Sequence, residues 1–126
     1  MTINQKIIHA VTQVVEVCVP DLYEPGENEQ AAEVYCTFNY SSRGGLFADD
    51  SPSFDIYMVQ VHLFAPFGWN SLDTRKQIKT RLFEAGFTWP SEVDAGNGYK
   101  TDDSKKQHIV FECEIEESIE ITEVNK

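Results

Sequence analysis

Two apolar runs separated by a long mixed loop dominate the first half of the chain. The runs are Val34–Tyr40 and Ile56–Phe64, and the loop Ser41–Phe54 between them reads SSRGGLFADDSPSF. A tight hairpin needs about two to five connecting residues, so a loop of about fourteen is far longer than the turn requires. Disordered segments are poor in large apolar residues, and Leu46 and Phe47 therefore argue against simple disorder. We expect an arm between two strands that reaches another molecule.

Size and charge restrict the class of protein. The chain has 126 residues, of which 41% are apolar and 25% are charged, as in an ordinary globular domain. The 21 Asp and Glu residues outnumber the 10 Lys and Arg residues, which gives a net charge of −11. Because proteins hold nucleic acids through Lys and Arg, we expect no direct affinity for DNA or RNA. No apolar run approaches the roughly 20 residues that span a bilayer, and the start MTINQK is unlike a signal peptide. We therefore expect one cytosolic domain over residues 1–126.

The cysteines are inconsistent with a metal or redox motif. Cys18, Cys36 and Cys113 are odd in number and far apart, and each lies in an apolar segment. Zinc sites and thioredoxin-like proteins use closely spaced cysteine pairs, which this chain lacks. We expect three buried free thiols in a reducing compartment.

The N-terminal segment has the spacing of an amphipathic helix. Apolar side chains recur every three or four positions over residues 3–19, which predicts a helix capped by Thr2 or Asn4 and ended by Pro20. The many valines are mediocre helix formers, so a strand over Val14–Val19 remains an alternative.

A second helix is expected over residues 71–85. Asn70 or Ser71 would cap its start, and Gly86 would end it in a left-handed conformation. Its expected inward face contains Leu72, Ile78, Leu82 and Phe83.

The other apolar segments alternate with the period of a strand. In Ile56–Phe64 one face would contain Tyr57, Val59, Val61 and Leu63, and in Gln107–Glu116 the inward face would contain Ile109, Phe111, Cys113 and Ile115. Val93 would begin a weak strand. The acidic segment 21–33 is expected to be a linker, and residues 117–126 an edge strand or a frayed tail. The fold class is α+β, with an antiparallel sheet of about four strands packed against two helices and a long arm between the first two strands.

The residue types that catalyse reactions are scattered. Of the three histidines, His62 and His108 lie on expected strands and could face each other, and Asp49 and Asp50 could join them in a metal or hydrolase site. However, the histidines do not share a metal-binding spacing, and the chain has no nucleophile elbow, zinc-protease or phosphate-binding motif. We therefore expect ordinary cross-strand histidines, with no catalytic residue, no metal and no cofactor.

Charges of opposite sign gather on two elements. Four basic residues lie within seven positions of the second helix, and three acids alternate along the last strand: Arg75, Lys76, Lys79 and Arg81, and Glu112, Glu114 and Glu116. Complementary patches on one chain suit a head-to-tail contact between copies, which closes into a ring where the rotation permits. A solvated helix surface is the alternative interpretation.

Three segments cover more than half of the chain: VYCTFNYSSRGGLFADDSPSFDIYMVQVHLFAP, NSLDTRKQIKTRLFEAGFTWPS and QHIVFECEIEE. With the N-terminal helix they give two long strands around an extended arm, a second helix and closing strands. This layout resembles the tail-completion and tail-terminator proteins of long-tailed phages and prophages. The acidic segment 21–33 departs from the family's pattern.

The resemblance implies a ring, commonly a hexamer, that sits on the end of the tail tube, stops its growth and joins it to the head connector. The implied partners are further copies of the chain and the tail-tube and head-connector proteins. The implied location is the host cytoplasm during assembly and then the virion tail. The expected interface residues are Arg43, Gly44, Gly45, Leu46, Phe47, Asp49, Asp50, Phe54, Arg75, Lys76, Lys79, Arg81, Glu112, Glu114 and Glu116.

Two other functions stay open at this point. A non-enzymatic protein-binding module would be monomeric and would order its arm on a foreign partner. A small metal-dependent hydrolase would use His62 and His108.

Overall fold

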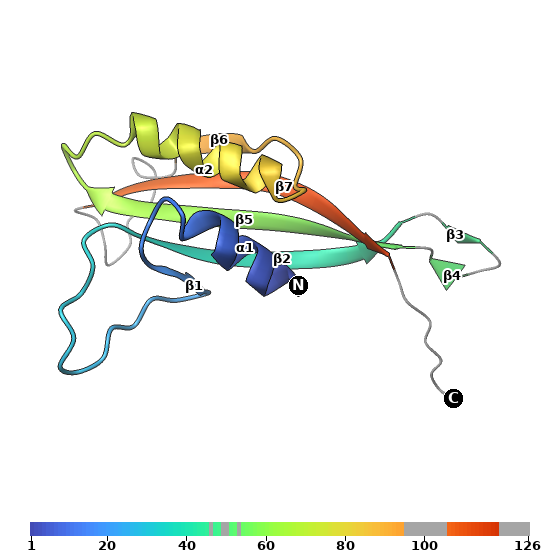
Figure 1. Ribbon diagram of the computed structural model, residues 1–126, viewed down its shortest axis with the longest axis horizontal. Helices are drawn as coiled ribbons and strands as arrows, with labels where there is room; N and C mark the ends of the chain where they lie inside the picture. Colours follow the sequence, from blue (N-terminus) through green and yellow to red (C-terminus); the bar gives the residue numbers. More distant parts are fainter. Residues whose placement is uncertain (46, 49–50, 53, 95–105, 119–126) are drawn as a thin grey trace.

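Two helices lie on one face of a five-stranded sheet in the computed structural model, which describes residues 1–45, 47–48, 51–52, 54–94 and 106–118 (Figure 1). The helices are α1 (Ile3–Val11) and α2 (Leu72–Glu84). The strands are β1 (Cys18–Pro20), β2 (Tyr35–Gly44), β3 (Phe47–Ala48), β4 (Ser51–Pro52), β5 (Phe54–Pro66), β6 (Ser91–Asp94) and β7 (Lys106–Ser118). The main sheet has the order β1-β2-β5-β7-β6, and β3 and β4 form a separate hairpin. β1 is parallel to β2, and the other neighbours are antiparallel.

The α+β class is confirmed, but the sheet is mixed and has five strands instead of about four antiparallel ones. The additional strand is β1, because the helix expected over residues 3–19 ends at Val11. Thr2 caps its start, as predicted. The amides of Val14 and Val15 both donate to the carbonyl of Val11 in a tight turn, and the carbonyl of Val17 then accepts from the amide of Cys36. The strand alternative over Val14–Val19 is correct only for Cys18 and Val19, because Val14 and Val15 lie in the turn that ends the helix.

The core lies between the helices and the sheet. β5 is the middle strand, and its 13 residues pair with β7 along their whole length, about 40 Å of sheet. The inward faces predicted for the two strands are confirmed: Val59, Val61, Leu63, Ile109, Phe111, Cys113 and Ile115 are buried, and Tyr57 packs against them. The helices complete this core with Ile3, Ile7, Val11, Ile78 and Leu82.

Helix α2 buries a narrower stripe than its sequence predicts. Ile78 and Leu82 are fully buried, but Leu72 and Phe83, which were expected to point inward, are 64% and 55% exposed. Both side chains lie on the flank of the helix, because at about 100° per residue their positions are about 100° and 120° from the middle of the stripe that Ile78 and Leu82 form. The helix ends as predicted, since Gly86 has a φ of +107° and the next amide returns to the carbonyl of Leu82.

The three cysteines are free and buried, as expected. Burial raises the pKa of Cys18 and of Cys113 to about 12, and for Cys113 the charge of Glu114 adds to this effect. Burial also raises the pKa of the Cys36 thiol well above its ordinary value. These thiols therefore act as small apolar core residues.

The long loop is an extension of the hairpin formed by β2 and β5. Both strands continue into the segment expected to be loop, β2 as far as Gly44 and β5 from Phe54 onward. The short β3–β4 hairpin projects at this end, beyond the ends of both helices (Figure 1). We call residues 45–54 the arm. Residues 119–126 of the expected edge strand or tail lie outside the described part of the chain.

Candidate functional site

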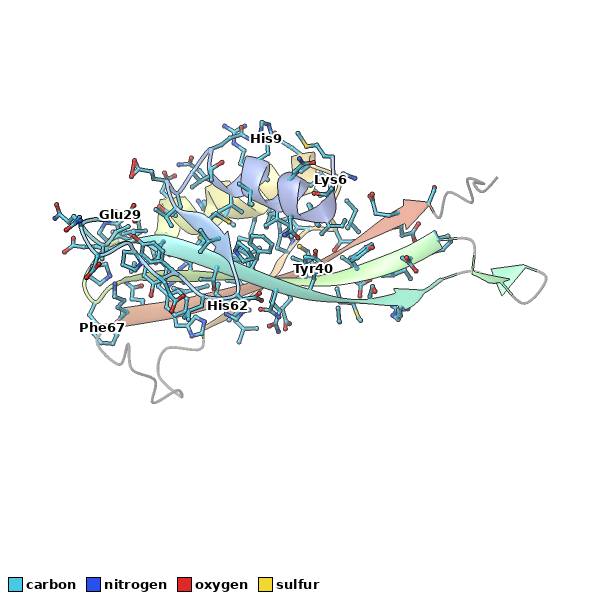
Figure 2. All side chains as sticks on the ribbon, turned by 90° about the horizontal axis from the view of Figure 1, so that it is seen from below. Lys6, His9, Glu29, Tyr40, His62 and Phe67 are labelled. Carbon is cyan, nitrogen blue, oxygen red and sulfur yellow. The ribbon has the colours of Figure 1, made fainter. Side chains whose placement is uncertain are left out.

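The side chains of β2, β5 and β7 that point away from the helices form a surface that we call the open face (Figure 2). No helix of the described part of the chain covers it, whereas both helices pack on the opposite side. Register and strand alternation place these residues on it: Tyr35, Thr37, Asn39, Ser41, Arg43, Ile56, Met58, Gln60, His62, Phe64, His108, Val110, Glu112, Glu114 and Glu116. Tyr35, Thr37 and Val110 are buried, and Tyr23 packs on Tyr35 at that end of the sheet. The polar and acidic side chains of the remaining part make it a candidate binding surface.

A hydrogen-bonded chain of five side chains crosses the open face. Nε2 of His62 donates to Oδ1 of Asn39 at 2.9 Å, which leaves Nδ1 of neutral His62 to accept from Nε2 of His108 at 2.8 Å. Nδ2 of Asn39 donates to Oε1 of Gln60 at 3.4 Å, and Nε2 of Gln60 donates to Oε2 of Glu112 at 2.9 Å. Every donor points the same way, from the histidine pair toward the carboxylate.

The two histidines meet because of the strand register. His108 lies opposite Phe64, and His62 is two residues from Phe64 on the same face, so the histidines are diagonal neighbours. The ring of Phe64 stacks on His108 with centroids 4.4 Å apart. Burial and the neighbouring His108 lower the pKa of His62, and the charge of Glu112 opposes this change only in part. The prediction that the two residues could face each other is confirmed, while Asp49 and Asp50 lie outside the described residues.

A groove of about 600 Å³ lies on the central part of the sheet. Segment 88–91, which includes the half-exposed ring of Trp89, forms one side of it. Its lining includes Asn39, Ser41, Met58, Gln60, Glu112 and Glu114. Two carboxylates, two amides and one indole suit a polar or cationic segment of another protein.

The described part of the predicted arm interface lies at one end of the sheet. Arg43 and Gly44 end β2, and the amide of Gly45 donates to the carbonyl of Phe54 at 2.7 Å, so that these two residues close the base of the arm. Phe47 lies in β3. Leu46, Asp49 and Asp50, also predicted as interface residues, lie outside the described part of the chain.

The basic residues of α2 are largely paired within the chain. Nη1 of Arg75 and Nζ of Lys79 contact the two carboxylate oxygens of Glu92 in β6, at 2.9 and 2.7 Å. Burial acts to raise the pKa of Glu92, but the hydrogen bonds and charges of Lys79 and Arg75 outweigh it and lower that pKa. Arg81 pairs with Glu84 at 3.3 Å. These contacts reduce the charge that α2 offers to a neighbouring copy.

The acidic residues of β7 lie on the open face, away from α2. Glu112 accepts a hydrogen bond from Gln60. Glu114 is 4.0 Å from Arg43, so an acidic residue of β7 contacts a residue at the base of the arm within one chain. Glu116 is exposed, as is Lys76 on α2. A contact between the two charged surfaces would therefore have to involve two copies, as the sequence suggested.

Both long sides of the sheet end in free edges near the arm. β1 pairs with β2 only over residues 36–38, and β6 pairs with β7 only over residues 109–112. Thr88 extends the second pairing to Glu114. Within the described residues, Asn39–Gly44 of β2 and Ile115–Ser118 of β7 have no outer neighbour strand. Such edges can accept a strand from another molecule.

Sequence reasoning missed the free edges and Trp89 as parts of this surface. The lengths of β1 and β6 determine which edges are free, and the sequence contains only weak signals for these short strands. Neither α1 nor α2 is long and apolar enough to cross a bilayer, and the described residues contain no other helix. Comparison with protein-family models and with curated proteins finds no match to this sequence.

Proposed function

We propose that the protein is a structural assembly protein of a long-tailed phage or prophage, and that it works as a tail terminator. In this role, copies of the chain form a ring on the end of the tail tube, stop its growth and join it to the head connector. The proposal rests on the layout of the elements, on the projecting arm and on the free strand edges beside it.

One observation carries the proposal: the arm and both free edges lie at the same end of a sheet that continues past the helices (Figure 1). An unpaired edge exposes backbone donors and acceptors, and monomeric proteins usually block or cover such an edge. Here β2 and β7 are the longer strands, yet β1 and β6 cover only one end of each. An arm of one copy that lies against an edge of the next would satisfy these groups.

The charge of the chain agrees with a ring around a DNA channel. Six copies at −11 would carry about −66, and such a field repels the phosphates of DNA that must pass without binding. The acids of the open face also offer contacts to the exposed Lys76 of a neighbouring copy.

Light scattering coupled to size exclusion tests the proposal. The protein would be measured over a range of concentrations and at low and high salt. We expect a closed ring of about six subunits, weakened by salt because exposed ion pairs are screened. A strict monomer at every concentration, also after incubation with purified tail tubes, would refute the proposal.

A protein-binding module is the second candidate, and the groove on the central part of the sheet favours it. A groove of about 600 Å³ with an exposed indole and two carboxylates can receive a segment of a foreign protein without self-assembly. A monomer that binds a basic peptide, and that loses the peptide on Trp89→Ala, would support this function over a ring.

A further inference from the structure

The histidine pair on the open face has the geometry of two ligands to one metal ion. Nδ1 of His62 and Nε2 of His108 are 2.8 Å apart. Zinc–imidazole bonds are about 2.0–2.1 Å long, so two imidazole nitrogens on one tetrahedral zinc ion lie about 3.3 Å apart. To bind one ion, the two nitrogens must move apart by about 0.5 Å and turn their lone pairs toward a common point.

Asn39 already prepares His62 as a ligand. Its carboxamide oxygen accepts from Nε2 of His62, which leaves the lone pair of Nδ1 directed at His108. A metal-binding histidine commonly donates its second N–H to a carbonyl or carboxylate in this way, and the bond fixes both tautomer and ring orientation. The hydrogen-bonded chain thus provides an outer shell for the pair.

The surroundings of the two rings favour a cation. The carboxylate of Glu112 interacts favourably with charge at His62. The ring of Phe64 stacks on His108, and its ring centroid also lies 6.5 Å from that of His62. Both histidines are half-buried, and strand register places them on the face opposite the helices.

We propose that His62 and His108 bind one divalent transition-metal ion, with zinc and copper as the preferred ions. Imidazole suits both ions, and Cu²⁺ heads the affinity order of the divalent first-row metals. The ion takes the lone pairs of Nδ1 in His62 and of Nε2 in His108. The proton on Nε2 of His108 passes to solvent as the ion binds, and the ring binds as neutral imidazole, so binding weakens as pH falls. Water completes the coordination, because no cluster of three His, Cys, Asp or Glu ligands occurs among the described residues.

The metal site would not depend on assembly of the subunits into a ring, since both of its protein ligands come from one chain. Its two water positions leave room for a ligand from a partner, which would link metal binding to assembly. The spacing of the two residues in the sequence gives no hint of this site, because the register of β5 and β7 brings them together across 46 positions.

Zinc titration by calorimetry at pH 7.5 tests the proposal on the full chain. We expect one zinc ion per chain, binding at least tenfold weaker in His62→Gln or His108→Gln, and no binding in the double variant. Asn39→Ala should weaken binding about tenfold, as the loss of an outer-shell partner does. His9→Gln, which changes the exposed histidine of α1, should bind as the wild type does.

A second measurement identifies the ligand atoms. Long-range proton–nitrogen spectra of the imidazole rings should show zinc-dependent shifts at Nδ1 of His62 and Nε2 of His108, and none at His9. Thermal unfolding of each variant shows whether it is folded. The proposal is overturned if folded wild-type protein binds no zinc at millimolar concentration. It is also overturned if the double variant binds zinc as the wild type does, because the ligands would then lie elsewhere.

Discussion

Gly45 lies so close to the ring of Phe54 that a Cβ atom at this position would overlap the ring. The amide of Gly45 also donates to the carbonyl of Phe54, so backbone and ring together fix the base of the arm. A glycine at this position is therefore required by close approach, and its φ angle is not in the left-handed region.

Gly45→Ala should displace the Phe54 ring and reorient the arm. We expect loss of self-association in light scattering, with a small change in melting temperature because the core beneath the helices is untouched. Gly26→Ala is the control, since the nearest side chain there is the flexible Glu29. If self-association is lost because the new Cβ overlaps the Phe54 ring, then Gly45→Ala should weaken self-association little further in a Phe54→Ala background, where that ring is absent. Full additivity of the two changes would contradict this explanation.

The apolar residues of the arm are expected to contact another subunit. Replacing Leu46 and Phe47 with Ser should abolish ring formation and leave thermal stability nearly unchanged. The comparison is Leu82→Ala in the core, where the side chain is fully buried and its loss should cost about 2–5 kcal/mol of unfolding free energy. A loss of stability as large as that of the core variant would mean that the arm residues pack within their own chain.

Glu92 connects the β6 edge to helix α2 through Arg75 and Lys79. Its pKa is lower in the folded protein than the ordinary value of 4.5. The ionised Glu92 carboxylate therefore makes its full contribution to the free energy of unfolding above about pH 4.5. This contribution is lost as pH falls through the lowered pKa of Glu92 in the folded protein. Glu92→Gln should lower the free energy of unfolding at pH 7 by about 1 kcal/mol, the scale of a small ion-pair network near the surface. Urea denaturation measures this, and Glu84→Gln, which removes a more exposed pair, should change it less.

Most of the fold could be predicted because its long elements have regular patterns. The alternation in Gln107–Glu116 and the glycine at position 86 predicted β7 and the end of α2. β1 was ambiguous because its three residues pair only when β2 is already in place. Leu72 and Phe83 were wrongly assigned to the core because helical spacing alone does not show how wide a stripe a sheet can cover.

The open face shows the limit of sequence reasoning about sites. The sequence indicates that His62 and His108 lie on strands, but only the register of the two strands determines that their nitrogens meet. The sequence contains no signal for Asn39 and Gln60, because lone amides on a strand are common; only the structure shows the directed hydrogen-bonded chain that they form.

Acid should weaken the fold through His62. Burial and the neighbouring His108 lower the pKa of His62 below its ordinary value of 6.5. Between the lowered pKa and about pH 6.5 the unfolded chain binds more protons at this residue than the folded chain does, so stability rises with pH. The contribution of His62 to the free energy of unfolding is therefore fully favourable above about pH 6.5. It declines as pH falls until His62 is protonated in the folded state too. A second proton on the pair also makes both facing nitrogens donors and breaks their hydrogen bond.

Urea denaturation at pH 5.5 and 7.5 tests this directly. The difference in unfolding free energy between the two pH values should be smaller in His62→Gln than in the wild type. His9→Gln, which removes an exposed histidine on α1, should keep the wild-type difference. Comparing variants at the same pair of pH values cancels the titration of the many carboxylates. If the free energy of unfolding changes with pH equally in wild type and His62→Gln, then the pKa of His62 is not lowered in the folded protein and this prediction is wrong.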